Sequence, residues 1–217
     1  MPSCAVLVSG GLDSAVLLTE QTANNSTVHP LFVESGFPWE ASELRHLRRF
    51  LEAIPGPAIQ PLHVLSLPVT DLYGDHWSLS GHVPDAGSPD SAVFLPGRNV
   101  LLLAKAMLWC HLHAVPAVAL AVLAANPFPD ATPAFFAAYS AAVNEAVGGT
   151  VQVLRPFAGM KKVEVIRRGR QLPLHLTFSC LRPQGDKHCG RCNKCGERRR
   201  AFCDAGVPDP TNYASVG

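Results

Sequence analysis

A glycine turn at residues 9–14, set between two apolar runs, constrains the fold of this chain more than any other feature. The turn has the sequence Ser-Gly-Gly-Leu-Asp-Ser and lies between the apolar residues 5–8 and 15–18. This order predicts a buried strand, a tight turn and a helix, whose first backbone N–H groups and positive dipole end converge on one point. Because glycines let an anion approach the backbone closely, the turn predicts a phosphate site. The alternative is an ordinary turn capped by Asp13 or Ser14.

The turn lacks the Lys-Ser or Lys-Thr ending of a P-loop. It resembles instead the PP-loop of ATP pyrophosphatases, which holds the β- and γ-phosphates of ATP during cleavage to AMP and pyrophosphate. An aspartate would repel phosphate on its own, so we expect Asp13 either to hold Mg²⁺ or to fix the turn. The resemblance implies ATP binding by the six residues of the turn, Ser9, Gly10, Gly11, Leu12, Asp13 and Ser14.

Apolar runs typical of strands alternate along the chain with segments of helical spacing. The expected strands are residues 5–8, 28–33, 62–67, 118–123 and 151–154. The expected helices are residues 14–22, 40–54, 99–113, 132–147 and 162–170. This alternation predicts a Rossmann-like α/β fold, an open and mostly parallel sheet with helices on both faces and ligands at the carboxyl ends of its strands.

Two segments depart from that alternation. Residues 69–94 are rich in Gly, Ser, Asp and Pro and have weak periodicity, so we expect a lid or substrate loop there. The cysteine-rich end of the chain predicts a small module. We therefore divide the chain into a nucleotide-binding domain at residues 1–175 and a metal-binding module at residues 176–217 that packs on it.

Composition gives no electrostatic argument for nucleic acid or a membrane as partner. The chain has 217 residues, a net charge of +1 and only 16% charged residues. Its most apolar stretch, residues 101–123, is interrupted by Lys105, His111, His113 and Pro116, which disfavours a membrane span. The first residues form no basic leader, so we expect a cytoplasmic protein.

Four cysteines near the end of the chain have the spacing of a metal site. Cys180, Cys189, Cys192 and Cys195 form a C-x8-C-x2-C-x2-C array, and two-residue gaps let neighbouring sulfurs reach one ion. We expect structural Zn²⁺, because four thiolates leave no open coordination position. Disulfides and an iron–sulfur cluster are the alternatives. His188 is expected at the surface or beside the site rather than as a ligand.

The same segment carries a basic run. We expect it to offset the negative charge of a thiolate site or to form a solvated helix face, with contact to nucleic acid as the alternative. Its members are Lys187, Arg191, Lys194, Arg198, Arg199 and Arg200. Two other thiols, Cys4 and Cys110, adjoin apolar runs and are expected in the core.

Together these motifs resemble the 7-cyano-7-deazaguanine synthase family of PP-loop, HUP-like enzymes. Between the turn and the cysteines, three segments match family elements: Pro-Gly-Arg-Asn at residues 96–99, Lys-Val-Glu-Val at 162–165 and Thr-Phe-Ser-Cys at 177–180. The cysteine segment Cys-Gly-Arg-Cys-Asn-Lys-Cys at residues 189–195 continues the match. The matching segments are spread over nearly the whole chain, so the combination is more specific than any one motif.

The resemblance implies an ATP-dependent ligase of queuosine biosynthesis. The carboxylate of 7-carboxy-7-deazaguanine would form an acyl adenylate, free ammonia would displace AMP, and a second ATP would convert the amide to the nitrile. Arg98 and Lys162 are the expected catalytic cations and Asn99 an expected ATP contact, although Lys161 could replace Lys162 and either charge could be a surface group. The resemblance also implies a homodimer.

The acceptor side departs from the family pattern. The family's Tyr-Pro-Asp-Cys-Arg-Pro-Glu-Phe element is replaced at residues 128–135 by Phe-Pro-Asp-Ala-Thr-Pro-Ala-Phe, where Asp130 survives as a candidate hydrogen-bond acceptor for a purine-like ring. Its Gly-Val-Asn and Tyr-Gly-Gln-x-His elements are also missing, at residues 119–121 and from residue 34 onward. Losing polar groups from a pocket changes which substrates it accepts.

Four hypotheses therefore stand side by side. The first is nitrile synthesis, and the second is a divergent paralogue that joins a deazapurine carboxylate to another amine, which could lie on a protein. The third is a tRNA-modifying PP-loop enzyme, and the fourth is a nucleotide-binding module without catalysis. Enzymes of the third class usually need a catalytic cysteine near the ATP site or a separate RNA-binding domain, and neither is evident in the sequence, so nucleic acid is not the expected partner.

Overall fold

The computed structural model describes residues 3–54 and 56–214 and contains one sheet of five parallel strands. The strand order is β3-β2-β1-β4-β5, so the direction of winding reverses between β1 and β4. Ligands of open α/β sheets bind at the carboxyl ends of the strands beside such a reversal. The predicted fold class is confirmed. The strands are β1 Ser3–Leu7, β2 Thr27–Glu34, β3 His63–Ser66, β4 Ala117–Ala119 and β5 Gln152–Leu154.

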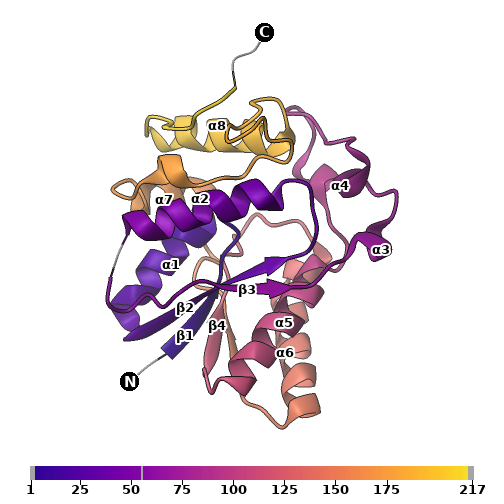
Figure 1. The fold of residues 1–217 in the computed structure, drawn as a ribbon, viewed down its shortest axis with the longest axis vertical. Coiled ribbons are helices and arrows are strands. Elements are labelled where there is room, and N and C mark those ends of the chain that lie inside the picture. Colours follow the sequence, from indigo (N-terminus) through magenta and orange to yellow (C-terminus); the bar gives the residue numbers. More distant parts are fainter. Residues whose placement is uncertain (1–2, 55, 215–217) are drawn as a thin grey trace.

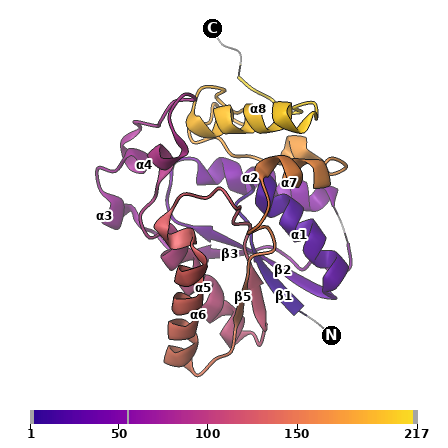
Figure 2. The same ribbon diagram turned by 180° about the vertical axis from the view of Figure 1, so that it is seen from behind.

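Helices cover both faces of the sheet (Figures 1 and 2). On one side of the sheet, α1 (Leu12–Asn24) packs against β1 and β2, α7 (Lys162–Arg168) packs against α1, and α8 (Asn193–Ala205) packs against α7. Together with α2 (Glu40–Ala53) these helices share one apolar core. The other face packs against α5 (Arg98–Leu112) and α6 (Pro133–Val147). Successive strand residues point to opposite faces, so Cys4 and Val6 enter the first core, whereas Ala5 and Leu7 enter the second. Cys4 and Cys110 are buried, as expected.

The segment expected to be a lid or loop is more ordered than its composition suggested. It contains two single-turn helices, α3 (Thr70–Tyr73) and α4 (Trp77–Ser80), and the 3₁₀ helix η1 (Asp90–Val93). Trp77 of α4 stacks on Trp39 with ring centroids 5.8 Å apart. Ala86 N–H donates to the Arg191 carbonyl at 2.8 Å, which ties the segment to the cysteine-rich end. Contacts with residues distant in the sequence keep this segment ordered, and local hydrophobic periodicity cannot reveal such contacts.

Other boundaries shift by a few residues. The strand expected at residues 118–123 is β4, Ala117–Ala119, because the chain bends where Val122 N–H donates to the Leu120 carbonyl. Thr132 caps α6 by accepting a hydrogen bond from Phe135 N–H at 3.2 Å. Two 3₁₀ turns complete the elements, η2 (Pro129–Ala131) and η3 (Leu174–Leu176).

Residues beyond η3 lie over the carboxyl ends of the strands, where α8 packs on α7. Phe178 N–H donates to the Gly10 carbonyl at 2.7 Å, which attaches this segment directly to the glycine turn. The division at residue 175 stays a prediction. In the part of the chain that the structure describes, no helix has the length and apolarity needed to cross a membrane.

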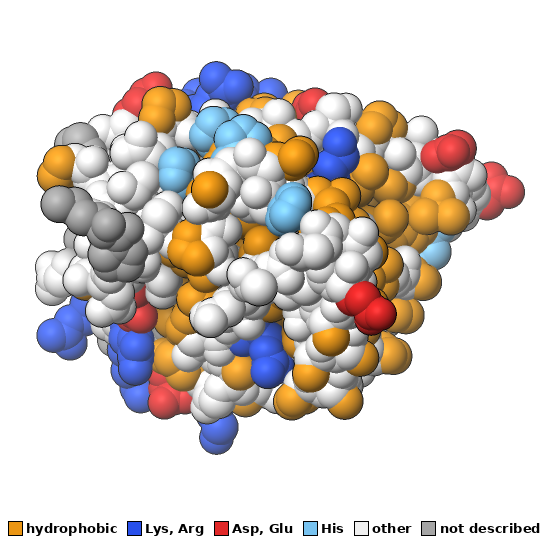
Figure 3. Space-filling model, turned by 90° about the horizontal axis from the view of Figure 1, so that it is seen from below, with side chains coloured by type: hydrophobic (Ala, Val, Ile, Leu, Met, Phe, Trp, Pro, Cys, Tyr) orange, Lys and Arg blue, Asp and Glu red, His pale blue; other side chains and the backbone are white. Residues whose placement is uncertain are grey.

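Histidine side chains gather on the face seen in Figure 3. His63 is the first residue of β3, and His29 is the third residue of β2. His63 lies against Trp109 with ring centroids 4.8 Å apart, and Trp109 stacks on His113 at 4.2 Å. Within residues 3–54 and 56–214, the only cluster with metal-ligand spacing is the four cysteines. Among the described residues, these histidine side chains therefore pack against Trp109 and do not form a metal site.

The turn itself provides a test of the fold. Gly10 has φ +75°, and a Cβ there would lie 2.7 Å from the Glu43 carbonyl oxygen, whereas Gly148 has φ +61° with nothing within 4 Å. We expect Gly10→Ala to lower the free energy of unfolding by about 3 kcal/mol or more and Gly148→Ala by about 1 kcal/mol, because only the first adds a clash to the left-handed strain. Urea unfolding of both variants measures the difference, and equal losses would contradict the crowding at Gly10.

Candidate active site

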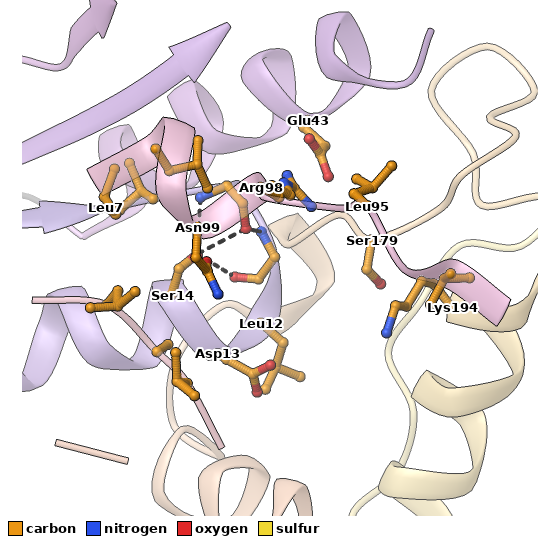
Figure 4. Close-up of a pocket in the computed structure, with 18 of the residues that line it drawn as sticks. Leu7, Leu12, Asp13, Ser14, Glu43, Leu95, Arg98, Asn99, Ser179 and Lys194 are labelled. Atoms are coloured by element: carbon orange, nitrogen blue, oxygen red, sulfur yellow. Dashed lines mark hydrogen bonds between the residues drawn. The ribbon is translucent and has the colours of Figure 1, made fainter. Parts of the chain in front are cut away.

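A cavity of about 340 Å³ opens at the carboxyl ends of β1, β2 and β4 (Figure 4). Its volume lies within the range of about 300–1,000 Å³ usual for ligand sites. The glycine turn and the first residues of α2, α5 and α7 contribute to its walls, and α8 closes it from the cysteine-rich end. Four aromatic side chains line it, which are Phe32, Trp39, Phe128 and Phe178.

The glycine turn is held by its own serines. Ser9 N–H donates to Ser14 Oγ at 3.2 Å, Gly11 N–H donates to Ser9 Oγ at 3.3 Å, and Ser14 Oγ–H donates to the Gly11 carbonyl at 3.1 Å. Gly11 is the N-cap of α1 in an extended conformation and makes no side-chain cap. The first N–H groups of α1 therefore face the cavity mouth without intrahelical partners, which is the arrangement of an anion site.

The six predicted turn residues divide by position. Five of them line the cavity, with Leu12 also reaching into the core at 2% exposure. Gly10 is not among the lining residues, because it packs behind the turn against the backbone of Glu43 and accepts the hydrogen bond of Phe178. Gly10 therefore supports the conformation of the turn without lining the cavity.

A chain of alternating charges joins three helices around the cavity. Lys162 of α7 lies 2.5 Å from Asp13 Oδ2 of α1 and 3.6 Å from Glu197 Oε1 of α8, and Lys194 lies 2.6 Å from Glu197 Oε2. Burial disfavours the charge of Lys162, but Asp13 and Glu197 outweigh it and raise its pKa, so the ammonium stays protonated. Burial opposes the charge of Glu197 as well, but Lys162 and Lys194 lower its pKa to about 2.

Of the two candidate lysines, the structure brings Lys162 to the cavity, whereas Lys161 is exposed at the N-cap of α7. Lys194 and Glu197 were not predicted as cavity residues. The sequence signal for these two residues was their i, i+3 spacing on one helix, with Lys194 between two cysteines and Glu197 just after the last one. Asp13 fixes the turn through its ion pair with Lys162, while its buried Oδ1 has no hydrogen-bond partner among the described residues.

Three predicted site residues, Arg98, Asn99 and Asp130, lie together at the start of α5. Arg98 begins α5 and lines the cavity beside Asn99 and Asp130. Asn99 N–H donates to Asp130 Oδ2 at 2.9 Å, and Asn99 Nδ2–H donates to the Asp130 carbonyl at 2.9 Å. Asp130 therefore caps the N-terminus of α5, which positions Arg98 at the cavity.

Two buried carboxylates of α2 were missed, because acidic residues at a helix start are usually exposed dipole partners. Glu40 Oε2 accepts hydrogen bonds from the N–H groups of Ser35, Gly36 and Phe37 at 2.7–3.1 Å and so fixes the loop after β2. Glu43 lines the cavity near Arg98 (Figure 4). Burial raises the pKa of Glu43 to about 8 against the opposing effect of Arg98.

The four cysteine sulfurs converge as a metal centre requires. All four are buried, and their ligand atoms lie within 4.8 Å of one another. Thiolates at about 2.3 Å from a tetrahedral ion lie about 3.8 Å apart, and the sulfur pairs Cys189–Cys195 and Cys192–Cys195 are 3.9 and 3.5 Å apart. Cys189 N–H donates to Cys180 Sγ at 3.2 Å, a contact that suits a thiolate ligand. The donor set fits zinc.

Around the cysteines, burial decides between the alternatives expected for two residues. Arg198 is not a solvated charge, because it is 3% exposed and donates to Thr211 Oγ1 at 2.6 Å and to the Leu174 carbonyl at 2.9 Å. His188 is not at the surface but 2% exposed, and its Nε2 accepts from Ser179 N–H at 3.2 Å, beside the first cysteine ligand. Both hold the segment that leads into the metal site.

Comparison with solved structures shows the same fold at low identity. A predicted subunit of a tRNA methyltransferase from Methanocaldococcus jannaschii has a TM-score of 0.50 at 14% identity, covering 77% of this chain and 75% of that one. A 4-thiouridine synthetase, solved as an RNA complex with bound ATP, has a TM-score of 0.53 at 15% identity, covering 94% of this chain and 50% of that one.

Comparison of sequences identifies the family. A 7-cyano-7-deazaguanine synthase of Xanthomonas oryzae pv. oryzae is 31% identical over 225 residues, covering 99% of both chains. One from Rhizobium leguminosarum bv. trifolii is 32% identical, covering 96% of this chain and 90% of that protein. The family model described as "Queuosine biosynthesis protein QueC" matches residues 3–206. The chain therefore belongs to the QueC family.

Proposed function

We propose that this protein is an ATP-dependent ligase that converts 7-carboxy-7-deazaguanine and ammonia to 7-cyano-7-deazaguanine, with release of AMP and pyrophosphate. The observation that carries the proposal is the meeting of the glycine turn, Lys162 and Arg98 in one cavity at the reversal of the sheet. An anion-binding turn with two cations beside it suits a nucleotide whose α-phosphate is attacked. Full-length similarity to enzymes named for this product supports it.

In the first half-reaction, a carboxylate oxygen of the substrate attacks the α-phosphorus and pyrophosphate leaves. The N–H groups of the turn hold the departing phosphates, and Lys162 and Arg98 offset the charge that develops on them. The acyl adenylate has a good leaving group where the carboxylate had none. Ammonia adds to the acyl carbon, AMP leaves, and loss of a proton gives the amide.

In the second half-reaction, the amide oxygen attacks the α-phosphorus of another ATP and pyrophosphate leaves. Departure of AMP with the amide oxygen, together with loss of both N–H protons of the amide, forms the carbon–nitrogen triple bond. Both half-reactions can use the same set of residues, because the attacking atom is each time an oxygen bonded to the same carbon. A single cavity is sufficient for both.

Two metals complete the proposal. Mg²⁺, when bound with the triphosphate, supplies further charge neutralisation, and the unpartnered Asp13 Oδ1 is the oxygen that would hold it. Zn²⁺ would be held by Cys180, Cys189, Cys192 and Cys195 in a structural role. Because Lys194 lies between two of these cysteines and lines the cavity, the zinc site also supports the ATP site.

A second candidate function keeps the adenylation and changes the amine. The observation that favours it is the acceptor segment, where Thr132 is used as a helix cap, Pro133 begins α6 and Ala134 is exposed. No ionisable group follows Asp130 in that segment. A wall without those groups suits an acyl adenylate that is captured by a larger amine, which could belong to a protein.

Product analysis separates the two functions. The pure protein is incubated with ATP, Mg²⁺, ammonium and 7-carboxy-7-deazaguanine, and the products are identified by mass. We expect AMP, pyrophosphate and the nitrile. The amide as the end product would support the second candidate, and no AMP with this carboxylate would contradict both.

The lysine pair gives a matched test of the ATP site. We expect Lys162→Met to lower the rate of AMP formation by about 10²-fold or more, because it removes a cation at the developing charge. Lys161→Met, at an exposed position one residue away, should leave the rate within about twofold. Similar losses in both variants would mean that Lys162 has no special role.

The cysteine site is tested by metal content and stability. We expect Cys189→Ser to lose bound zinc and several kcal/mol of unfolding free energy, since structural zinc contributes on the order of 10 kcal/mol. Cys203→Ser, at an exposed thiol outside the cluster, should keep both. Metal analysis and thermal unfolding provide the readouts. Purified protein that holds iron instead of zinc would overturn the assignment of the metal.

A further inference from the structure

Five carboxylates line the cavity, and four of them are engaged by the protein itself. Asp13 pairs with Lys162, Glu40 accepts three backbone N–H groups, Asp130 caps α5, and Glu197 pairs with two lysines. For the fifth, Glu43, the structure of residues 3–54 and 56–214 contains no hydrogen bond or ion pair to its carboxylate. Glu43 is thus the uncommitted carboxylate of the cavity.

The surroundings of Glu43 make that isolation costly. The residue is 8% exposed, and its charged neighbours are Arg98 of α5 and Glu40 of its own helix. The apolar side chains of Trp39, Leu95 and Phe178 line the same cavity. An ionised carboxylate without partners in such a place is costly, so burial raises the pKa and holds the unliganded group largely in its protonated form at neutral pH. A buried carboxyl group that has no partner in the fold and is aimed into a cavity points to a ligand whose N–H donors would stabilise its ionised form.

The chemistry of a carboxylate restricts that ligand. An ionised carboxylate only accepts hydrogen bonds, and its two oxygens match two parallel N–H donors. Guanine-type rings carry such a pair, N1–H and the 2-amino group, side by side. An adenine ring presents a donor next to an acceptor on its pairing edge, so the base of ATP cannot satisfy both oxygens. The triphosphate is excluded by charge.

We propose that the Glu43 carboxylate accepts hydrogen bonds from the N1–H and 2-amino groups of the deazapurine acceptor and so selects a guanine-type ring. The inference rests on the function proposed above and specifies which edge of its substrate is recognised. Aromatic side chains of the cavity provide flat surfaces for the ring. Glu43 takes this task on the side of α2, because Asp130, the acidic residue kept from the family pattern, is used to cap α5.

The test compares two substrates in two variants. AMP formation is measured with 7-carboxy-7-deazaguanine and with its 2-desamino analogue, 7-carboxy-7-deazahypoxanthine. In the unchanged protein we expect kcat/KM for the analogue to be about 10²-fold lower, because one oxygen of Glu43 is left without a donor. In Glu43→Gln, kcat/KM for 7-carboxy-7-deazaguanine should fall to the value for the analogue, mainly through a higher KM. The value of kcat/KM for the analogue should change by less than about threefold. Glu52→Gln, exposed on the same helix, is the matched control.

The fold of the variant is followed by thermal unfolding across pH. Burial raises the pKa of Glu43 from 4.5 to about 8, so its contribution to stability is complete below pH 4.5 and is lost as the pH rises to 8. Glu43→Gln carries no such charge and should have a higher Tm than the unchanged protein at pH 8, with the difference shrinking toward pH 5. A lower Tm at pH 8 would reveal a structural partner and overturn the proposal.

Other outcomes would overturn the proposed role of Glu43 without contradicting the proposed ligase function. Equal kcat/KM for the two substrates in the unchanged protein, or a preference that persists in Glu43→Gln, would show that another group recognises the edge. A tenfold weaker ATP affinity in Glu43→Gln, measured by calorimetry without acceptor, would place Glu43 against the nucleotide. All three leave AMP formation intact, whereas failure to bind 7-carboxy-7-deazaguanine at all would overturn this inference and the proposed function together.

Discussion

The hydrogen bond from Phe178 N–H to the Gly10 carbonyl joins the two ends of the chain at the point on which the cavity depends. It holds the glycine turn from one side, while the backbone of Glu43 fills the space that a side chain at residue 10 would need. A turn whose N–H groups must converge on an anion cannot be loose, because misplaced donors bind poorly. The fold therefore clamps Gly10 between α2 and the segment leading into the cysteines.

The charges of the cavity follow from the same clamp. Asp13, Lys162, Glu197 and Lys194 alternate in sign across α1, α7 and α8, so none of them is buried without a counter-charge. A partly buried ion pair of this kind adds little to stability and much to orientation. Because Cys192 and Cys195 flank Lys194, the metal-binding end of the chain sets the position of a cavity wall. The two parts are joined through side chains as well as through the backbone.

On the cavity wall opposite the glycine turn, polar side chains bond mainly to one another. Asp130 and Asn99 bond to each other and fix the start of α5, so neither has its full polar capacity free for a ligand. Arg98 and Glu43 lie near one another without a hydrogen bond between them, and the positive charge of Arg98 only partly offsets the effect of burial on the pKa of Glu43. Because residues 131–135 carry no ionisable side chain, the charged groups on this side of the cavity come from α2, α5 and Asp130.

The parallel sheet, the turn and the convergence of the cysteines were predictable, because alternating apolar periods, a strand–glycine–helix order and two-residue gaps between thiols are local signals. Lys162 could not be chosen over Lys161 from the sequence, since only the start of α7 decides which lysine faces the cavity.

The order of residues 69–94, the burial of Arg198 and His188, and the isolation of Glu43 were decided by tertiary structure alone. Each depends on partners far along the chain, such as Arg191 for Ala86 and Leu174 for Arg198. The sequence determines which residues can bind an anion or a metal. Packing determines which of those groups remain free to do so, because hydrogen bonds and ion pairs within the fold occupy the rest.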